Sequence, residues 1–241
     1  MIKKLTILLL LFALPVYAGI QDKHKSVIAQ MQGVVQLTGS AEAITWAAGA
    51  DPAGQSITIP ADATAVYMFW TYWADSDGAG LATATLNSVS RDAVSELPIS
   101  TGPGMVGTGV AVWYSCCTGS QTLDIAWDVA PTEGPTTIVV YVKGGNLSAW
   151  RDVDTDQNTD ANAVTVTIDS TTNDLVLKYD GRIGATAPGL SASWTNTLIQ
   201  ENIVTYSARL SSADTSGAAT TVCNSENESY STIICVSVPK L

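Results

Sequence analysis

The stretch from Val110 to Lys143, VAVWYSCCTGSQTLDIAWDVAPTEGPTTIVVYVK, contains three strand patterns separated by turn residues. The first, Val110–Tyr114, directs apolar side chains to both sides of the chain. The second, at 122–127, alternates apolar and polar residues, the two-residue period of a strand with one buried face. The third, Thr137–Lys143, is β-branched or aromatic almost throughout, which predicts a strand covered on both faces.

The alternation of strands and turns continues on both sides of this stretch. Thr64–Trp73 is a strongly apolar and aromatic run, which predicts a central strand buried on both faces. Asn87–Ser88 predicts the turn of a hairpin, and the Gly- and Pro-rich run Pro98–Gly109 predicts a surface loop. Other strands are expected at Ser56–Ile59, Thr83–Leu86, Val89–Val94, Ala163–Ile168, Leu175–Tyr179, Ile203–Leu210 and Thr232–Val238.

The whole pattern predicts the fold class. Strand patterns recur about every ten residues, and neither an amphipathic helix nor an internal repeat interrupts them. We therefore expect an all-β protein with one large antiparallel, jelly-roll-like β-sandwich domain at residues 40–241. A composition with 46% apolar and 14% charged residues suits such a core.

The N-terminus has the pattern of a secretion signal. Lys3 and Lys4 precede an apolar run, and Val16–Ala18 places small residues where a signal peptidase cleaves. Residues 1–18 are therefore predicted to be a signal peptide, and the mature protein to be secreted or held at the cell surface. An uncleaved anchor is the alternative, but the apolar run is shorter than the roughly 20 residues of a membrane-spanning helix.

Residues 19–39 are interpreted as an N-terminal arm. Val27, Ile28 and Met31 have helical spacing, whereas Val35 and Leu37 alternate as in a strand, so the pattern does not choose between the two. Two roles stay open for the arm. It adds a strand to the sheet of a neighbouring subunit, or it is an edge strand of its own domain.

The chain is acidic. Its formal net charge of −11 becomes −13 once Lys3 and Lys4 leave with the signal peptide. An acidic surface repels nucleic acid and anionic lipid, and it favours solubility, cations or basic partners. We therefore expect no nucleic-acid partner, and no transmembrane segment after signal cleavage.

Four cysteines remain after cleavage: Cys116, Cys117, Cys223 and Cys235. An even number of cysteines in an exported chain indicates disulfides. A bridge between Cys223 and Cys235 would clamp a hairpin across the polar loop between them. Cys116 and Cys117 could form a vicinal bridge, pair crosswise with the other two or stay reduced, so the three possible connectivities remain open. A structural role is favoured over a redox role because no activating base is visible nearby.

Several of these patterns resemble a known group of proteins. They occur in the order TATLNSVS (83–90), VAVWY (110–114), TLDIAW (122–127), VVYVKG (139–144), WRD (150–152), VTVTI (164–168) and NDLVLKYDG (173–181). Together they resemble the jelly-roll-like β-sandwich modules of secreted bacterial and phage-encoded proteins, over Gln55–Val238. The resemblance implies an adhesive, structural or virion-surface role, and it carries over no catalytic residue.

The sequence argues against an enzyme. His24 is the single histidine and lies in the arm, so a Ser-His-Asp or Cys-His centre in the domain would lack its base. Asp124 and Asp128 lie on one strand, where a solvated sheet face is favoured over a catalytic pair. We therefore predict no catalytic residues, and no cofactor other than calcium.

The candidate calcium site is an acidic run that is expected to form a loop after residue 151. Residues with side-chain oxygen ligands alternate along it: Asp152, Asp154, Asp156, Asn158 and Asp160. Ca²⁺ prefers oxygen ligands of this kind. The turn Gly and terminal Glu of an EF-hand loop are missing, so a solvated acidic loop without an ion is the competing interpretation.

Tryptophan side chains are the candidate carbohydrate-binding groups: Trp70, Trp73, Trp113, Trp127, Trp150 and Trp194. Exposed rings would stack on sugars, but such rings more commonly fill a core or a subunit interface. Trp70 and Trp73 have opposite parity on one strand, so at most one of them is expected to face the core.

The sequence therefore predicts a non-catalytic, exported β-sandwich that acts as a structural or adhesive surface subunit and can self-assemble. A carbohydrate-binding module is the alternative, and it requires two or three coplanar exposed rings. The expected partners are further copies of the chain, or a cell-surface or carbohydrate partner.

Overall fold

The computed structural model describes most of the chain between Val35 and Lys240. The described residues are 35–74, 80–97, 106–114, 117–132, 135–145, 150–158, 163–171, 174–183, 197–202, 206–214, 220–225 and 231–240. They lie in one compact unit, Val34–Leu241. The expected signal peptide, His24 and residues 19–34 of the expected arm lie outside the described residues.

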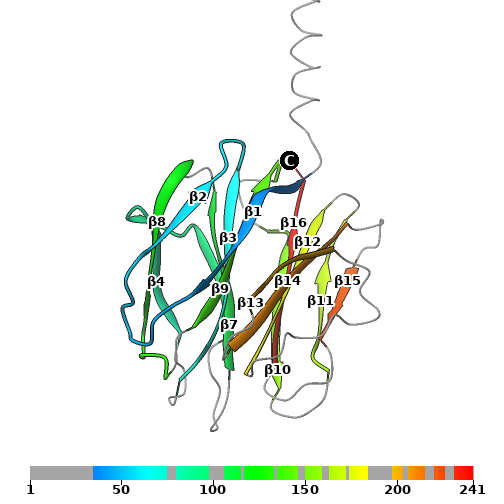
Figure 1. The fold of residues 1–241 in the computed structure, drawn as a ribbon. Helices are drawn as coiled ribbons and strands as arrows, with labels where there is room; N and C mark the ends of the chain where they lie inside the picture. The colour runs from blue at the N-terminus through cyan, green and yellow to red at the C-terminus, as the bar shows by residue number, and fades with distance from the viewer. Residues whose placement is uncertain are drawn as a thin grey trace, which may run out of the picture. The chain divides into compact units, whose positions relative to one another are not determined.

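The described residues form four antiparallel sheets, numbered 1 to 4 here in the order in which they stack (Figure 1). Sheet 1 contains β2 (Gln55–Ile59), β8 (Gly119–Trp127), β4 (Leu81–Leu86) and β5 (Val89–Ser90). Sheet 2 contains β1 (Gln36–Thr45), β9 (Thr136–Lys143), β3 (Ala65–Trp73), β7 (Val106–Tyr114) and β6 (Ala93–Leu97).

The two remaining sheets come from the second half of the chain. Sheet 3 contains β10 (Asp152–Asn158), β16 (Ser231–Val238), β12 (Leu175–Ile183), β14 (Tyr206–Asp214) and β13 (Thr197–Asn202). Sheet 4 contains β11 (Thr165–Asp169) and β15 (Thr220–Asn224). The expected all-β class with antiparallel sheets is confirmed. Within the described part of the chain, no helix has the length and apolar character needed to cross a membrane.

The pairing of β1 to β9 has the order of a jelly roll. β1 pairs with β9, β2 with β8, β3 with β7, and β4 with β5. A long antiparallel ribbon that is rolled up gives this nesting, and the pairs β3–β9 and β4–β8 then join neighbouring turns of the roll. β6 adds a fifth strand to sheet 2 by pairing with β7.

Three apolar clusters fill the spaces between the sheets. The first joins sheets 1 and 2, the second joins sheets 2 and 3, and the third joins sheets 3 and 4. Sheet 2 therefore has both faces covered: on β3, Met68 and Trp70 lie in the first cluster, while Tyr67 and Phe69 lie in the second. The expected double-sided burial of β3 and β9 is confirmed, and it explains why their sequences do not alternate.

Two glycines of β7 lie beside large rings of β3. The register places Gly109 opposite Trp70 and Gly107 opposite Tyr72. A Cβ at Gly109 would lie 2.2 Å from Trp70 Cζ2, and a Cβ at Gly107 would lie 2.3 Å from Tyr72 Cε1. The rings thus occupy the space that side chains at these positions would need, and the expected loop at Pro98–Gly109 is wrong for its last residues.

The N-terminal arm ends inside the domain. β1 begins at Gln36, within the segment 19–39, and pairs with β9 of the same chain at the edge of sheet 2. Val35 is buried between sheets 2 and 3. The end of the arm is therefore an edge strand of its own domain, the second of the two roles left open by the sequence.

Two other strand boundaries differ from the expectation. Asn87 and Ser88 join β4 to β5 with φ of 44° and 68°, values suited to a two-residue hairpin turn, but β5 ends at Ser90 rather than Val94. The chain then crosses to sheet 2, where β6 begins at Ala93. A strand was also expected at Ile203–Leu210, where the structure ends β13 at Asn202 and begins β14 at Tyr206.

Replacing Gly109 by Ala tests the packing of rings against β7. The added Cβ clashes with the fully buried ring of Trp70, so we expect the substitution to lower the free energy of unfolding by about 2 kcal/mol, a typical cost of overpacking. Denaturant unfolding measures the change. Thr122→Ala, on the exposed face of β8, is the control and should change stability by less than about 0.5 kcal/mol. Equal effects of the two substitutions would contradict the packing role.

Candidate functional site

The acidic run that was expected to form a calcium loop is a strand. β10 pairs with β16 along one edge of sheet 3. Alternate side chains of a strand are spaced about 7 Å apart along one face, so Asp152, Asp154 and Asp156 are not gathered around one point. The expected loop conformation is therefore wrong at Asp152–Asn158, and Asp160 lies outside the described residues.

The aspartates of β10 accept hydrogen bonds from the backbone of the same strand. The pairs are Val153 N–H to Asp152 Oδ1 at 2.9 Å, Thr155 N–H to Asp154 Oδ1 at 2.9 Å, and Gln157 N–H to Asp156 Oδ1 at 2.8 Å. In an antiparallel pair, alternate residues direct their N–H groups away from the neighbouring strand. These carboxylates satisfy such donors and add negative charge along the edge, which opposes pairing with another strand.

Calcium binding stays a prediction. Among the residues that the structure describes, no three or more His, Cys, Asp or Glu side chains form a group that could hold a metal ion. The alternating acids of β10 are explained by the free edge of the sheet, where carboxylates act as acceptors for backbone donors.

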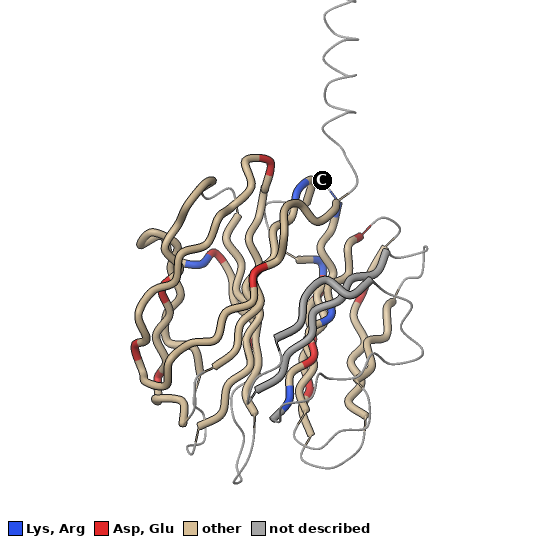
Figure 2. The backbone as a smooth tube through the Cα atoms, in the orientation of Figure 1, with Lys and Arg blue, Asp and Glu red and all other residues tan. Residues whose placement is uncertain are grey.

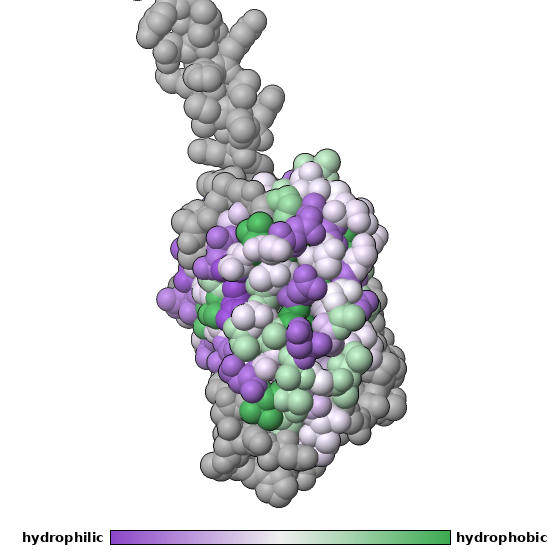
Figure 3. Space-filling view, turned by 90° about the vertical axis from the view of Figure 1, so that its left-hand side faces the viewer, coloured by the Kyte–Doolittle hydropathy of each residue, from purple (hydrophilic) through white to green (hydrophobic). Residues whose placement is uncertain are grey.

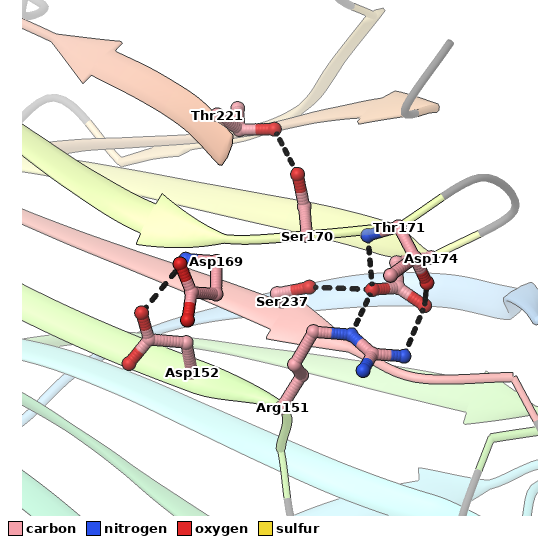
Figure 4. Close-up of polar contacts among 8 residues, drawn as sticks. All are labelled: Arg151, Asp152, Asp169, Ser170, Thr171, Asp174, Thr221 and Ser237. Atoms are coloured by element: carbon pink, nitrogen blue, oxygen red, sulfur yellow. Dashed lines mark hydrogen bonds and ion pairs between the residues drawn. The ribbon is translucent and has the colours of Figure 1, made fainter. Parts of the chain in front are cut away.

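Asp174 is a buried acid that joins the start of β10 to β12 and β16 (Figure 4). Its Oδ2 lies 2.5 Å from Arg151 Nε, and its Oδ1 lies 3.2 Å from a terminal nitrogen of the same guanidinium. Thr171 donates from its N–H at 2.8 Å and from its hydroxyl at 3.1 Å, and the Ser237 hydroxyl donates at 3.0 Å. Both carboxylate oxygens are thus bonded within the fold.

The hydrogen bonds to Asp174 decide its ionisation. Burial alone would raise the pKa of the carboxyl, but the bonds from Arg151, Thr171 and Ser237 together outweigh burial and hold the pKa below its usual 3.8. The charged form is therefore the one that the fold stabilises. Arg151 is about one third exposed and Asp174 is 1% exposed, so the pair reaches from the surface into the layer between the sheets.

Two further contacts extend this cluster to sheet 4 (Figure 4). Asp169 at the end of β11 donates its N–H to Asp152 Oδ2 at 2.7 Å. The hydroxyls of Ser170 and Thr221 lie 2.8 Å apart. The cluster therefore connects one end of sheet 3 to both strands of sheet 4, which is a structural role.

A buried ion pair in β12 was missed by the sequence analysis. Lys178 Nζ lies 2.9 Å from Asp180 Oδ2, with side-chain exposures of 0% and 2%. Lys178 Nζ also donates to the backbone oxygen of Asn224 on β15 at 2.8 Å. The signal was present in NDLVLKYDG, because Lys178 and Asp180 alternate with apolar residues on a strand that neighbours others on both sides.

Two glutamates connect sheet 2 to sheet 1. Glu42 Oε1 accepts the Thr58 N–H at 3.0 Å and a hydrogen bond from the Tyr141 hydroxyl. Glu96 Oε1 accepts the Leu81 N–H at 2.9 Å. Burial raises the pKa of Glu96, and the nearby negative charge of Asp128 adds to the increase, while the Leu81 N–H and Arg91 oppose it. Because these acceptors bond backbone donors of the facing sheet, they hold sheets 1 and 2 together.

The tryptophans expected as candidate sugar-binding groups are largely interior. Trp70, Trp113 and Trp127 are buried between sheets 1 and 2, while Trp73 and Trp150 are half-buried. Trp194 lies outside the described residues. Trp70 lies in the first cluster and Trp73 in none of the three, so at most one of the two faces the core, as expected.

One of the expected disulfides is present. Cys223 bonds to Cys235, which joins β15 to β16. These strands belong to different sheets, so the bridge fastens sheet 4 to sheet 3 instead of clamping a hairpin, as the sequence suggested. Cys117 is a half-buried free thiol, and Cys116 lies outside the described residues.

Comparison of the chain with protein-family models, with curated proteins and with solved structures found no match.

Replacing Asp174 by Asn tests the cluster of Figure 4. Loss of the charge leaves Arg151 without its partner, so we expect the free energy of unfolding to fall by about 3 kcal/mol at pH 7. Because the pKa of Asp174 is lowered in the folded state, this stabilisation is complete above about pH 5 and is lost progressively as the pH falls through 3.8 and then through the lowered pKa. The difference between wild type and variant, measured by denaturant unfolding, should therefore shrink in acid. Asp124→Asn, exposed on sheet 1, is the control, and a pH-independent difference would contradict the assignment.

Replacing Asp154 and Asp156 together by Thr tests the guarded edge. The double variant removes two charges and two carboxylate acceptors from β10, so we expect concentration-dependent association that wild type lacks at this edge. Light scattering after gel filtration measures it. The matched control, Asp51 and Asp124 to Thr, removes the same charge from exposed positions away from the edge. If both variants associate equally, the lower net charge alone explains the association and the edge has no special role.

Proposed function

We propose that this chain is a non-catalytic, exported β-sandwich protein that acts as a structural or adhesive subunit at a surface. The observation that carries the proposal is that the buried charged side chains and the carboxylates of β10 form hydrogen bonds or ion pairs within the protein. The buried charged side chains Asp174, Lys178 and Asp180 bond to other parts of sheets 3 and 4. The carboxylates of β10 bond to their own strand.

The layered core supports a scaffold role. Sheet 2 is packed on both faces, and the charged residues of sheets 1 and 2 are few along their strands (Figure 2). The outer face of sheet 1 carries small hydroxyl residues such as Ser56, Thr58 and Thr122, which are exposed. The view from this side shows hydrophilic residues intermixed with weakly apolar ones and a few separate strongly hydrophobic ones (Figure 3).

Export is supported by the disulfide as well as by the N-terminal sequence. A structural disulfide forms and persists in oxidising compartments, and Cys223–Cys235 is fully buried. Residues 1–18 have the composition of a cleaved signal. We therefore propose a mature chain that begins at Gly19 and resides outside the cytoplasm.

Self-association is part of the proposal. The edge formed by β10 is guarded by carboxylates, so copies would meet through other edges or through residues 19–34. This segment lies before Val35, where the described domain begins, and is the expected means of strand exchange between subunits.

The proposal is tested by producing the protein with its own N-terminus in an exporting bacterial host. We expect the exported chain to begin at Gly19 and to form species larger than the monomer, which N-terminal sequencing, gel filtration with light scattering and negative-stain imaging measure. A strict monomer at high concentration would overturn self-association, and retention in the cytoplasm would overturn export.

A deletion defines the contact between copies. Removing residues 19–34 leaves β1 intact and should dissolve assemblies that depend on the arm. Removing 19–39 would also remove the start of β1, which pairs with β9, so that deletion confuses assembly with folding. Unchanged assemblies after the shorter deletion would place the contact on the sheets.

A further inference from the structure

Sheet 4 is the smallest layer of the stack. β11 and β15 pair with each other over five residues, Thr165–Asp169 with Thr220–Asn224. Among the strands that the structure describes, neither pairs with a strand of another sheet. A two-stranded sheet is marginally stable by itself in water, so sheet 4 depends on side-chain contacts with sheet 3.

The contacts between sheets 3 and 4 are few and well defined. The apolar cluster between them consists of Val164, Val166, Ile168, Val176, Cys223, Ile233 and Cys235. Polar contacts add the bond from Lys178 Nζ to the Asn224 oxygen, and the bond from the Asp169 N–H to Asp152 Oδ2. The clusters on the two faces of sheet 2 are larger and include Trp and Tyr rings, so sheet 4 is the layer held by the least apolar packing.

Besides the chain segments that connect their strands, the disulfide is a covalent bond between these two layers. Cys223 lies on β15 in sheet 4 and Cys235 on β16 in sheet 3, 12 residues apart in sequence. Both are 0% exposed. In Figure 1, β11 and β15 lie together beside the strands of sheet 3.

We propose that the Cys223–Cys235 bridge is a redox-sensitive latch that holds sheet 4 over sheet 3. A thiol reductant opens it in two steps. The thiolate of one reductant molecule attacks a sulfur of the bridge, forms a mixed disulfide and releases the other cysteine, which takes a proton. A second reductant thiolate releases the first cysteine and leaves as the oxidised reductant, so two electrons and two protons reach the protein.

Burial of the bridge makes the latch depend on motion of the layer. A reductant cannot reach sulfur atoms that are fully covered, so sheet 4 must first separate from sheet 3. In the oxidised protein the bridge makes opening less favourable, because Cys223 and Cys235 stay joined when sheet 4 separates from sheet 3. Once the bridge is reduced, the same opening is no longer limited by the covalent tie.

Opening would change the surface chemistry of sheet 3. Lys178 and Asp180, with Val176 and Ile233 beside them, lie on the face that sheet 4 covers. Water would then reach a buried ion pair and apolar side chains together. The reduced protein would therefore present a mixed charged and apolar surface that the oxidised protein hides. This inference does not depend on the proposed surface role.

Hydrogen exchange measured by mass spectrometry tests the latch on the full chain, oxidised and after reduction with dithiothreitol. Cross-linking a loop of this length shifts the opening equilibrium by about a hundredfold. We expect exchange of the β11 and β15 amides to accelerate about a hundredfold on reduction, while the amides of β3, β7 and β9 keep their rates. Cys117→Ser, which removes the free thiol, should behave as wild type in both states.

Two results would overturn the latch. Equal acceleration in all four sheets, or loss of folding on reduction, would show that the bridge stabilises the whole domain. Unchanged exchange in β11 and β15 would show that packing alone holds sheet 4. The Cys223→Ala and Cys235→Ala double variant repeats the measurement without reductant, and it should match the reduced wild type.

Discussion

Burial of both faces of sheet 2 is the constraint on which the rest of the structure depends. β3 and β9 lie inside this sheet and have almost no exposed residue. An apolar strand of this kind is stable in water only if something covers each side of it. Sheet 1 covers one side and sheet 3 the other, so both halves of the chain are required to bury the same few strands.

The sequence predicts those parts of the fold that are set by residues close to one another in the chain. Double-sided burial at Thr64–Trp73, alternation at Leu123–Trp127 and the Asn87–Ser88 turn are each set by neighbouring residues, and the structure confirms them. Gly107 and Gly109 were misinterpreted as loop residues, because their meaning depends on the rings of a strand that lies far away in the sequence.

The candidate site was less predictable than the fold, because the same residues serve two kinds of structure. Alternating aspartates suit a calcium loop and also a guarded sheet edge, and only the pairing of β10 with β16 shows that they lie on a strand. The Arg151–Asp174 pair and the Lys178–Asp180 pair depend on burial, which periodicity reveals only when the neighbouring layers are known. The Cys223–Cys235 pairing was one of three connectivities that the sequence left open, and its placement between two sheets depends on the fold.

The nesting of β1 to β9 also sets the order in which the chain can fold. β1 pairs with β9 from the far end of the roll, so sheet 2 cannot be completed until residues 36–143 are all present. Pairings of such long sequence separation make folding slow, because a large loop must close before the contacts form. A nascent chain therefore stays incompletely folded during most of its synthesis, which is the state that the proposed export would require.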